Sequence, residues 1–268
     1  MTINTNMAAL NSANDLDATQ TRLDHSLAEL SSGSKIISPA DDPAGLAAAT
    51  RINAEAQSTT AAQNNVSSAL SFTQTQDGYL SGIATALSQM SQLAVQAQDE
   101  TESPSDLSLY DLEYQQLNSY ITSTAAKDFD GVSLFTGNTI EVPLDADNAS
   151  SLVMNGIDLS AGAYAAVTAT DIGTTTGAAA AMAAVDAAIT QLATDRGTLG
   201  SYETRLNYAA DQLSVGEQNL TAASSQIEDV DVADASTEYA TESVLLQSTT
   251  AMLAQANQLP QTVLKLIS

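Results

Sequence analysis

The sequence predicts a mainly α-helical protein: an elongated coiled-coil helical rod whose N- and C-terminal helices pair with each other, with a small β-hairpin region. Three observations support this fold class. Leucine recurs at seven-residue intervals over long stretches, which is the spacing of a coiled-coil seam. Aromatic residues make up only 4% of the chain, too few for a broad globular core. The hydrophobic share is nevertheless 44%, which argues against disorder despite a formal net charge of -25.

Each end of the chain predicts one amphipathic helix. Leu16, Leu23 and Leu30 are seven residues apart near the N-terminus, and Leu245 and Met252 begin the same spacing near the C-terminus. Neither helix can bury its apolar stripe alone, so we expect the ends to pair with each other and with other subunits. The residues expected at this interface are Ile3, Met7, Leu10, Leu16, Leu23, Leu27, Leu30, Leu245, Met252, Leu253, Leu259, Val263 and Leu266.

Two further helices are expected in the first half of the chain. One should begin in the Pro43 to Gly45 region and end near Ser103-Pro104, because proline disfavours helical geometry in the residue before it. The other should run from about 106 to 126. Both can pack antiparallel against the long helix of the second half. The apolar stripe expected for the second of them is Leu109, Leu112, Leu117 and Ile121.

The third quarter of the chain predicts one long helix. Six apolar residues follow each other at seven-residue intervals from Leu192 to Ile227, and Ile189 and Val185 extend the helix backward. Almost fifty residues make a helix of roughly 70 Å, longer than the roughly 48 Å diameter of a compact sphere of this chain length. We therefore expect an elongated rod. Its predicted core is Leu80, Ile83, Leu87, Met90, Leu192, Leu199, Leu206, Leu213, Leu220 and Ile227.

Only residues 138–177 differ from this helical pattern. Two short β-prone runs, Thr139 to Pro143 and Ser151 to Ile157, flank a turn-rich segment and predict one or two hairpins at a tip of the rod. The expected domains are a terminal helical domain (1–42 and 230–268), a helical rod domain (43–137 and 178–229) and this short hairpin and loop region.

The sequence offers no catalytic, cofactor-binding or metal site. His25 is the single histidine and cysteine is absent, so neither a His-x-x-x-His zinc site nor a thiolate metal site can be assembled, and we expect His25 to be a solvated or interface residue. The acidic run from Glu228 to Asp234 lacks the central glycine of a calcium loop and is expected to be a helix junction or N-terminal cap.

The acidic balance also excludes classes of partner. With 32 acidic against 7 basic residues, binding to a phosphate backbone is not expected. No stretch is long and apolar enough to predict insertion in a membrane, and no secretory signal is visible at the start. These signals alone would place the chain in the cytoplasm.

Both ends of the sequence closely resemble bacterial flagellins. The motifs at the N-terminal end are Ile3-Asn4-Thr5-Asn6, Ala9-Leu10, Leu30-Ser31-Ser32-Gly33-Ser34-Lys35-Ile36 and Asp41-Asp42-Pro43-Ala44-Gly45-Leu46-Ala47. Those at the C-terminal end are Leu199-Gly200, Gln226-Ile227-Glu228-Asp229-Val230-Asp231 and Leu253-Ala254-Gln255-Ala256-Asn257-Gln258-Leu259-Pro260-Gln261 with Val263-Leu264. Leu93-Ala94-Val95-Gln96-Ala97 and Phe129-Asp130-Gly131 extend the likeness, which covers about 1–137 and 178–268.

The resemblance implies a subunit that polymerises into the flagellar filament for swimming motility, in a short form without large outer domains. It implies export through the flagellar type III apparatus without a cleaved signal, with an export chaperone, the filament cap and hook-associated proteins as partners. The expected location is then the extracellular filament, in place of the cytoplasm. A hook-filament junction protein is the alternative within this class. A helical enzyme or adhesin would need a site in the central insert, whose composition offers none.

One segment departs from the family pattern. Many flagellins carry Arg, Val, Arg and Glu before Leu-Ala-Val in the stretch that innate immune receptors recognise. This chain has Gln89, Met90, Ser91 and Gln92 there, so the charged hydrogen bond of the arginine is lost. We do not expect strong receptor recognition.

Overall fold

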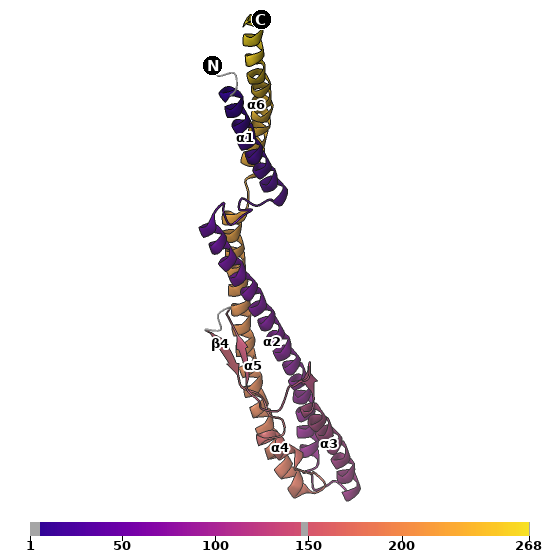
Figure 1. Ribbon diagram of the computed structural model, residues 1–268. Helices are drawn as coiled ribbons and strands as arrows, with labels where there is room; N and C mark the ends of the chain where they lie inside the picture. The colour runs from indigo at the N-terminus through magenta and orange to yellow at the C-terminus, as the bar shows by residue number, and fades with distance from the viewer. Residues whose placement is uncertain (1–5, 146–149, 268) are drawn as a thin grey trace. The chain divides into compact units, whose positions relative to one another are not determined.

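The computed structural model of the protein describes residues 6–145 and 150–267, without the side chains of 259–267. The fold is mainly α-helical, with a few short antiparallel strands, as the sequence predicts (Figure 1). Its elements in chain order are α1 (Met7–Ser32), α2 (Pro43–Gln96), α3 (Pro104–Ala125), β1 (Asp128–Phe129), β2 (Val132–Ser133), β3 (Ile140–Pro143), β4 (Ser151–Met154), α4 (Gly162–Thr168), α5 (Thr175–Glu228) and α6 (Val232–Ile267).

The chain forms two compact units. The first joins both ends of the chain, Met1–Glu55 and Asn219–Ser268, and the second is Ala56–Gln218. Helices α2 and α5 each contribute residues to both units. The predicted interface residue Ile3 lies outside the described residues, as do the side chains of Leu259, Val263 and Leu266.

The start of α2 is determined by the residues immediately around it. Asp42 caps α2, because its Oδ1 accepts hydrogen bonds from the backbone N–H of Ala44 at 3.1 Å and of Gly45 at 2.9 Å. Pro43 follows at the first helical position, where no N–H is needed. A Cβ on Gly45 would collide with the Asp42 side chain, so glycine is required beside the cap. The predicted start of this helix is therefore correct, but its predicted end near Ser103-Pro104 is wrong, because α2 ends at Gln96 and Pro104 instead begins α3.

In the second unit, α2 and α5 pack antiparallel. Asp77 of α2 bonds Arg196 of α5, and Ser91 Oγ of α2 lies 3.5 Å from Met182 Sδ of α5. The later residue on α2 therefore contacts the earlier residue on α5, as in an antiparallel pair. Among the predicted rod-core residues, Leu220 and Ile227 are half-buried and belong to the first unit. The others are buried in the second unit: Leu80, Ile83, Leu87, Met90, Leu192, Leu199, Leu206 and Leu213.

The stripe expected for α3 is partly wrong. Leu109 and Leu112 are 63% and 65% exposed, whereas Leu107, Tyr114 and Ile121 are buried. These three are seven residues apart and form the true seam. Counting leucines misplaced the stripe, because a tyrosine occupies the central seam position and its hydroxyl bonds Thr170 Oγ1 at 2.8 Å. Ile189 of α5, at 37% exposed, also lies outside the seam, which runs through Val185, Ala188 and Leu192.

The predicted hairpin is β3 paired antiparallel with β4, Ile140 facing Met154 and Pro143 facing Ser151. It does not form a tip of its unit but lies beside α5, and α3 and α4 reach the end of the unit instead (Figure 1). The hairpin is anchored there because the Asn155 backbone N–H donates to Tyr202 Oη on α5 at 3.1 Å. A second hairpin, β1–β2, turns through Asp130 and Gly131, both with positive φ.

Helix α4 was not predicted, because its alanine- and threonine-rich sequence resembles that of a loop. Tyr164 and Val167 are buried and dock α4 into the core of the second unit. The Tyr164 hydroxyl donates to Asp195 Oδ2 at 2.7 Å, and burial, with that carboxylate, raises the pKa of Tyr164 well above its ordinary range. The tyrosine therefore remains a hydrogen-bond donor at any physiological pH.

Helix α5 is the one helix in the described part of the chain that could span a membrane by length and composition, a test that core helices of soluble proteins also pass. Its alanine-rich first half instead contributes to the core. Ala178, Ala181, Val185 and Ala188 are each fully buried against the other elements of the second unit.

Candidate subunit interface

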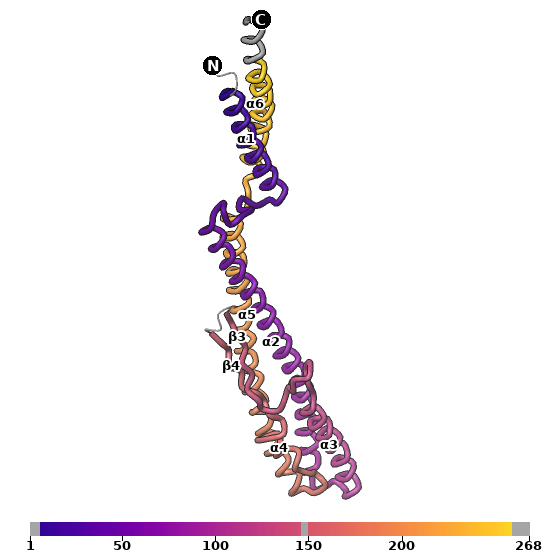
Figure 2. Tube along the Cα trace, viewed as in Figure 1, coloured from indigo at the N-terminus to yellow at the C-terminus, as the bar shows by residue number. Residues whose placement is uncertain are grey.

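The two chain ends form one antiparallel helix pair in the first unit, α1 beside α6 (Figure 2). Asn6 Nδ2 donates to the Ala256 carbonyl oxygen at 2.8 Å, and Arg22 Nη1 lies 3.4 Å from Glu242 Oε1. Residues near the start of α1 therefore meet residues far along α6. The terminal pairing expected from the two amphipathic ends is present within a single chain.

The turns that join this pair to α2 and α5 also meet. The Lys35 N–H donates to the Glu228 carbonyl oxygen at 2.7 Å, and the Val230 N–H donates to the Gly33 carbonyl oxygen at 3.0 Å. Ser34 and Asp229 face each other across this isolated β-bridge. Gly33 has a φ of 73°, a left-handed conformation that glycine adopts without strain and that ends α1. Two sequence motifs almost two hundred residues apart thus form one structural joint.

A polar network supports the joint from the helix side. Asn53 Nδ2 donates to Glu228 Oε2 at 3.0 Å, and the buried Ser224 hydroxyl donates to Asn53 Oδ1 at 2.7 Å. Asp231 caps α6, its Oδ1 accepting from the Ala233 N–H at 2.9 Å. The acidic run is a helix junction and cap, as the sequence predicts.

The single histidine bridges α1 to the segment that follows it. His25 Nδ1 lies 3.5 Å from Glu29 Oε1, and His25 Nε2 lies 3.3 Å from Asp41 Oδ1. Asp41 Oδ2 also accepts hydrogen bonds from the backbone N–H of Ile37 at 3.1 Å and of Ser38 at 2.8 Å. The bond from Ser38, with smaller help from His25, lowers the pKa of Asp41 below its ordinary value.

The buried seam of the terminal pair is more polar than the sequence suggested. On α1 the buried residues are Thr19 and Ser26, and Leu16, Leu23 and Leu30 are only half-buried. On α6 the seam follows a spacing of three and four residues. Its members are Ala235, Tyr239, Glu242, Leu246, Thr249, Leu253 and Ala256.

Several predicted interface residues point away from this seam. On α6 the expected stripe began with Leu245 and Met252, yet these are 40% and 64% exposed, because Leu246 and Leu253 face α1 in their place. Hydrophobicity could not distinguish these neighbouring positions. Besides Val232 at the start of α6, six large apolar side chains are left exposed on the described part of the pair, and they are termed here the outer apolar face: Met7, Leu10, Leu27, Val244, Leu245 and Met252.

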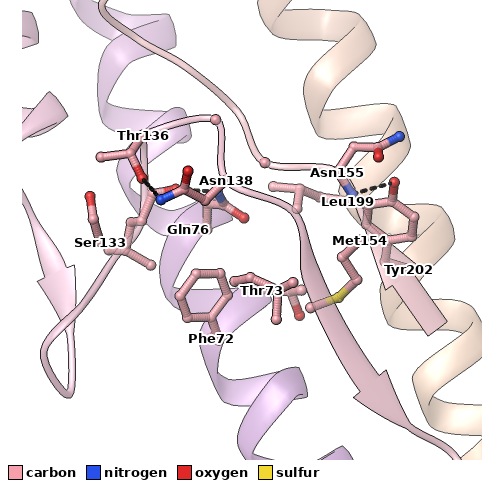
Figure 3. Close-up of a pocket in the computed structure, with 14 residues that line it drawn as sticks. Phe72, Thr73, Gln76, Ser133, Thr136, Asn138, Met154, Asn155, Leu199 and Tyr202 are labelled. Atoms are coloured by element: carbon pink, nitrogen blue, oxygen red, sulfur yellow. Dashed lines mark hydrogen bonds between the residues drawn. The ribbon is translucent and has the colours of Figure 1, made fainter. Parts of the chain in front are cut away.

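A small hollow lies in the second unit, between α2, α5 and the hairpin region (Figure 3). Phe72 and Tyr202 line it, and Gln76 Nε2 donates to the Leu134 carbonyl oxygen at 2.6 Å beside it. Its volume of about 10 Å³ is close to the minimum for one water molecule. Among the described residues, no three His, Asp or Glu side chains are placed to hold a metal ion.

Comparisons with known proteins agree with this arrangement. Residues 3–139 match the family model of the bacterial flagellin N-terminal helical region, and residues 182–267 match that of the C-terminal helical region. A flagellin of Halalkalibacterium halodurans is 33% identical over the full length of both chains. The 33 kDa flagellar filament core protein of Treponema phagedenis and a flagellin of Bacillus subtilis are each 30% identical, also over the full length of both chains.

A solved structure is similar as well. The crystal structure of a Bacillus cereus flagellin matches with a TM-score of 0.52 and 30% identity, covering 56% of this chain and 88% of that one.

Proposed function

Because the chain belongs to the bacterial flagellin family and is a structural subunit of the flagellar filament, we propose that α1 and α6 are the part through which it polymerises. The outer apolar face carries this proposal. Met7, Leu10, Val244 and Met252 are each more than half exposed in the single chain. Packing against other copies of the same chain would remove this surface from water at about 25 cal/mol per Å².

A helix pair suits this role because it is weak when alone. Its seam contains Thr19, Ser26 and Glu242, and its leucines are only half-buried. Little apolar area is therefore buried within one chain, and most of the stabilisation must come from neighbours. The joint at Gly33 and Val230 would connect this polymerising part to the rod.

The functional division follows from the same reasoning. Residues 1–42 and 230–268 form the terminal helical domain of the filament core, residues 43–137 and 178–229 the rod domain, and 138–177 the short hairpin region in place of outer domains. The compact units divide the chain elsewhere, placing residues up to Glu55 and from Asn219 onward with the terminal helices. The joint itself, between Gly33–Lys35 and Glu228–Val230, lies inside this first unit and ties these segments together.

Assembly partners follow from the place of the filament outside the cell. The family is structural rather than enzymatic, and its filament is an extracellular appendage. The subunit would leave the cell by the flagellar type III export apparatus without a cleaved signal, with help from an export chaperone. It would add to the filament beneath the cap, with hook-associated proteins at the base. None of the relatives described above is named as a hook-filament junction protein, the alternative within this class.

Polymerisation of purified variants tests the proposal. Met252→Asp and Leu245→Asp would each place an unpaired charge in the subunit interface, and both should abolish filaments seen by electron microscopy. Gln247→Asp, an exposed polar position on the same helix, is the matched control and should polymerise normally. Normal filaments from both interface variants would refute the assignment, provided that circular dichroism shows the rod domain folded in all three.

A further inference from the structure

Glu242 is a buried carboxylate in the seam of the terminal helix pair. It is 6% exposed, and its Oε2 is fully buried without a hydrogen-bond partner. Its Oε1 has one ionic neighbour, Arg22 Nη1 at 3.4 Å, whose side chain is 58% exposed. Burying a carboxylate with so little compensation costs stability, and an apolar residue would pack better there. The position therefore needs an explanation other than stability.

The rest of the seam does not define how α1 and α6 align. On α1 the seam alternates small polar residues with leucines every seven residues: Ser12, Leu16, Thr19, Leu23, Ser26 and Leu30. A slip of one helix along the other by seven residues, about 10 Å at 1.5 Å per residue, would again place leucines and small side chains in the same positions. Apolar packing along the seam would thus tolerate several registers. Besides the charges described next, a slip is opposed by the joint, whose two backbone hydrogen bonds connect Gly33–Lys35 to Glu228–Val230.

The flanking charges distinguish these registers. Arg22 precedes the seam position Leu23, and the residues seven before and seven after it are Asp15 and Glu29. A slip of α1 by seven residues in either direction would therefore place a carboxylate opposite the buried Glu242. Only the observed register gives Glu242 a cation, and both alternatives bring two like charges together in a partly buried seam.

We propose that Glu242 and Arg22 are positioning residues that fix the register of α1 against α6, with Asp15 and Glu29 acting against the slipped registers. The inference rests on the proposed function, since it concerns the helices through which the subunit would polymerise. A single register matters there because a helical polymer requires every copy to present the same outer apolar face.

The distance between two spin labels on one subunit tests this directly. Gln20→Cys and Ala251→Cys are suitable sites, because both positions are exposed and the chain has no cysteine of its own. They lie at different levels of the pair, so slips in the two directions change the distance in opposite senses. Labelled subunits are diluted into an excess of unlabelled wild-type subunits, and distances are measured by double electron-electron resonance in the filament.

We expect one distance in the parent and several in Glu242→Leu. The exchange of the pair, Arg22→Glu with Glu242→Arg, separates register selection from simple ion pairing. If Glu242 and Arg22 act only as an ion pair, the exchanged pair should show one distance. If the charges select the register, the exchanged pair should show several distances, because the arginine introduced on α6 would attract Asp15, Glu29 and the carboxylate introduced at position 22 alike. Adding Asp15→Arg and Glu29→Arg to the exchanged pair should restore the single parental distance.

Each outcome is decisive. A single parental distance in both Glu242→Leu and the exchanged pair would overturn the proposal. If the exchanged pair does not enter filaments, but the variant with all four substitutions enters them at the parental distance, the proposal is supported. If neither variant enters filaments, the proposal is overturned, because the four substitutions restore the charge pattern that should select the parental register. Absence of filaments from the wild-type subunit would instead refute the proposed function and leave the register to be measured in the free chain by the same labels.

Discussion

The Arg196 guanidinium forms a two-point contact with the Asp77 carboxylate, from Nε to Oδ1 at 2.7 Å and from Nη2 to Oδ2 at 3.0 Å. This pair joins α5 to α2 within the second unit, beside the buried Leu80 and Leu192. Its geometry matches the planar fork of arginine to a carboxylate, which lysine cannot reproduce. The two-point geometry therefore favours arginine over lysine at position 196.

Arg196→Lys should lower the stability of the second unit only slightly. The two side chains are 40% and 37% exposed, so solvent screening limits the contribution to about 1 kcal/mol or less. Thermal unfolding followed by circular dichroism should show a small decrease in Tm. Arg205→Lys, at an exposed position on the same helix, is the control and should leave the Tm unchanged. A large loss in Arg196→Lys alone would mean that the pair is far less screened than its exposure indicates.

Two glycine substitutions should have opposite effects. A Cβ on Gly156 would overlap the backbone of Gly137 and Asn138, so Gly156→Ala should destabilise the second unit by about 1–3 kcal/mol. Gly200 lies in an exposed stretch of α5 with open space around it, and Gly200→Ala should stabilise by about 0.5–1 kcal/mol. Denaturant unfolding of both variants checks the sign. Equal effects would contradict the close approach at Gly156.

The segment after α1 should depend on acid through Asp41. Hydrogen bonding from the Ser38 N–H lowers the pKa of Asp41 below 3.8, so its stabilising effect is present above that pH and is lost as the pH falls through the lowered pKa. The amide shift of Ser38 in NMR should follow this titration, with a midpoint below 3.8. In Asp41→Asn the Ser38 amide should no longer titrate. A midpoint above 3.8 in the parent would show that the bond is absent in solution.

Recognition by innate immune receptors should be weak. Gln89 and Gln92 are exposed on α2, where the family pattern has arginine and glutamate, while Met90 and Leu93 are buried. A receptor-reporter assay should give low potency for the natural chain. Gln89→Arg together with Gln92→Glu should raise it, because charged hydrogen bonds are regained. Full potency of the natural chain would show that recognition uses other residues.

The seven-residue repeats predicted the long helices because helix periodicity follows from backbone geometry alone. They did not predict which neighbouring residue enters a seam. On α6, Leu246 rather than Leu245 faces α1, and on α3 Tyr114 takes the place expected of a leucine. Both choices depend on the partner helix, which no local pattern describes.

The polar members of the terminal seam were missed for a related reason. Thr19, Ser26 and Glu242 carry no hydrophobic signal. Only their position three or four residues from a seam leucine on the same helix could have identified them. The joint between Gly33 and Val230 could not be predicted from the sequence, since its two segments are far apart in the chain. Their motifs were recognised by resemblance, and the structure supplies the contact between them.

Hydrogen exchange of α1 and α6 in the free subunit and in the filament tests the central claim most directly, namely that these helices obtain adequate burial only from other copies of the chain. We predict rapid exchange of both helices in the free subunit and strong protection in the filament, with α2 and α5 of the second unit protected in both states. Full protection of α1 and α6 in a free subunit that never assembles would contradict the account.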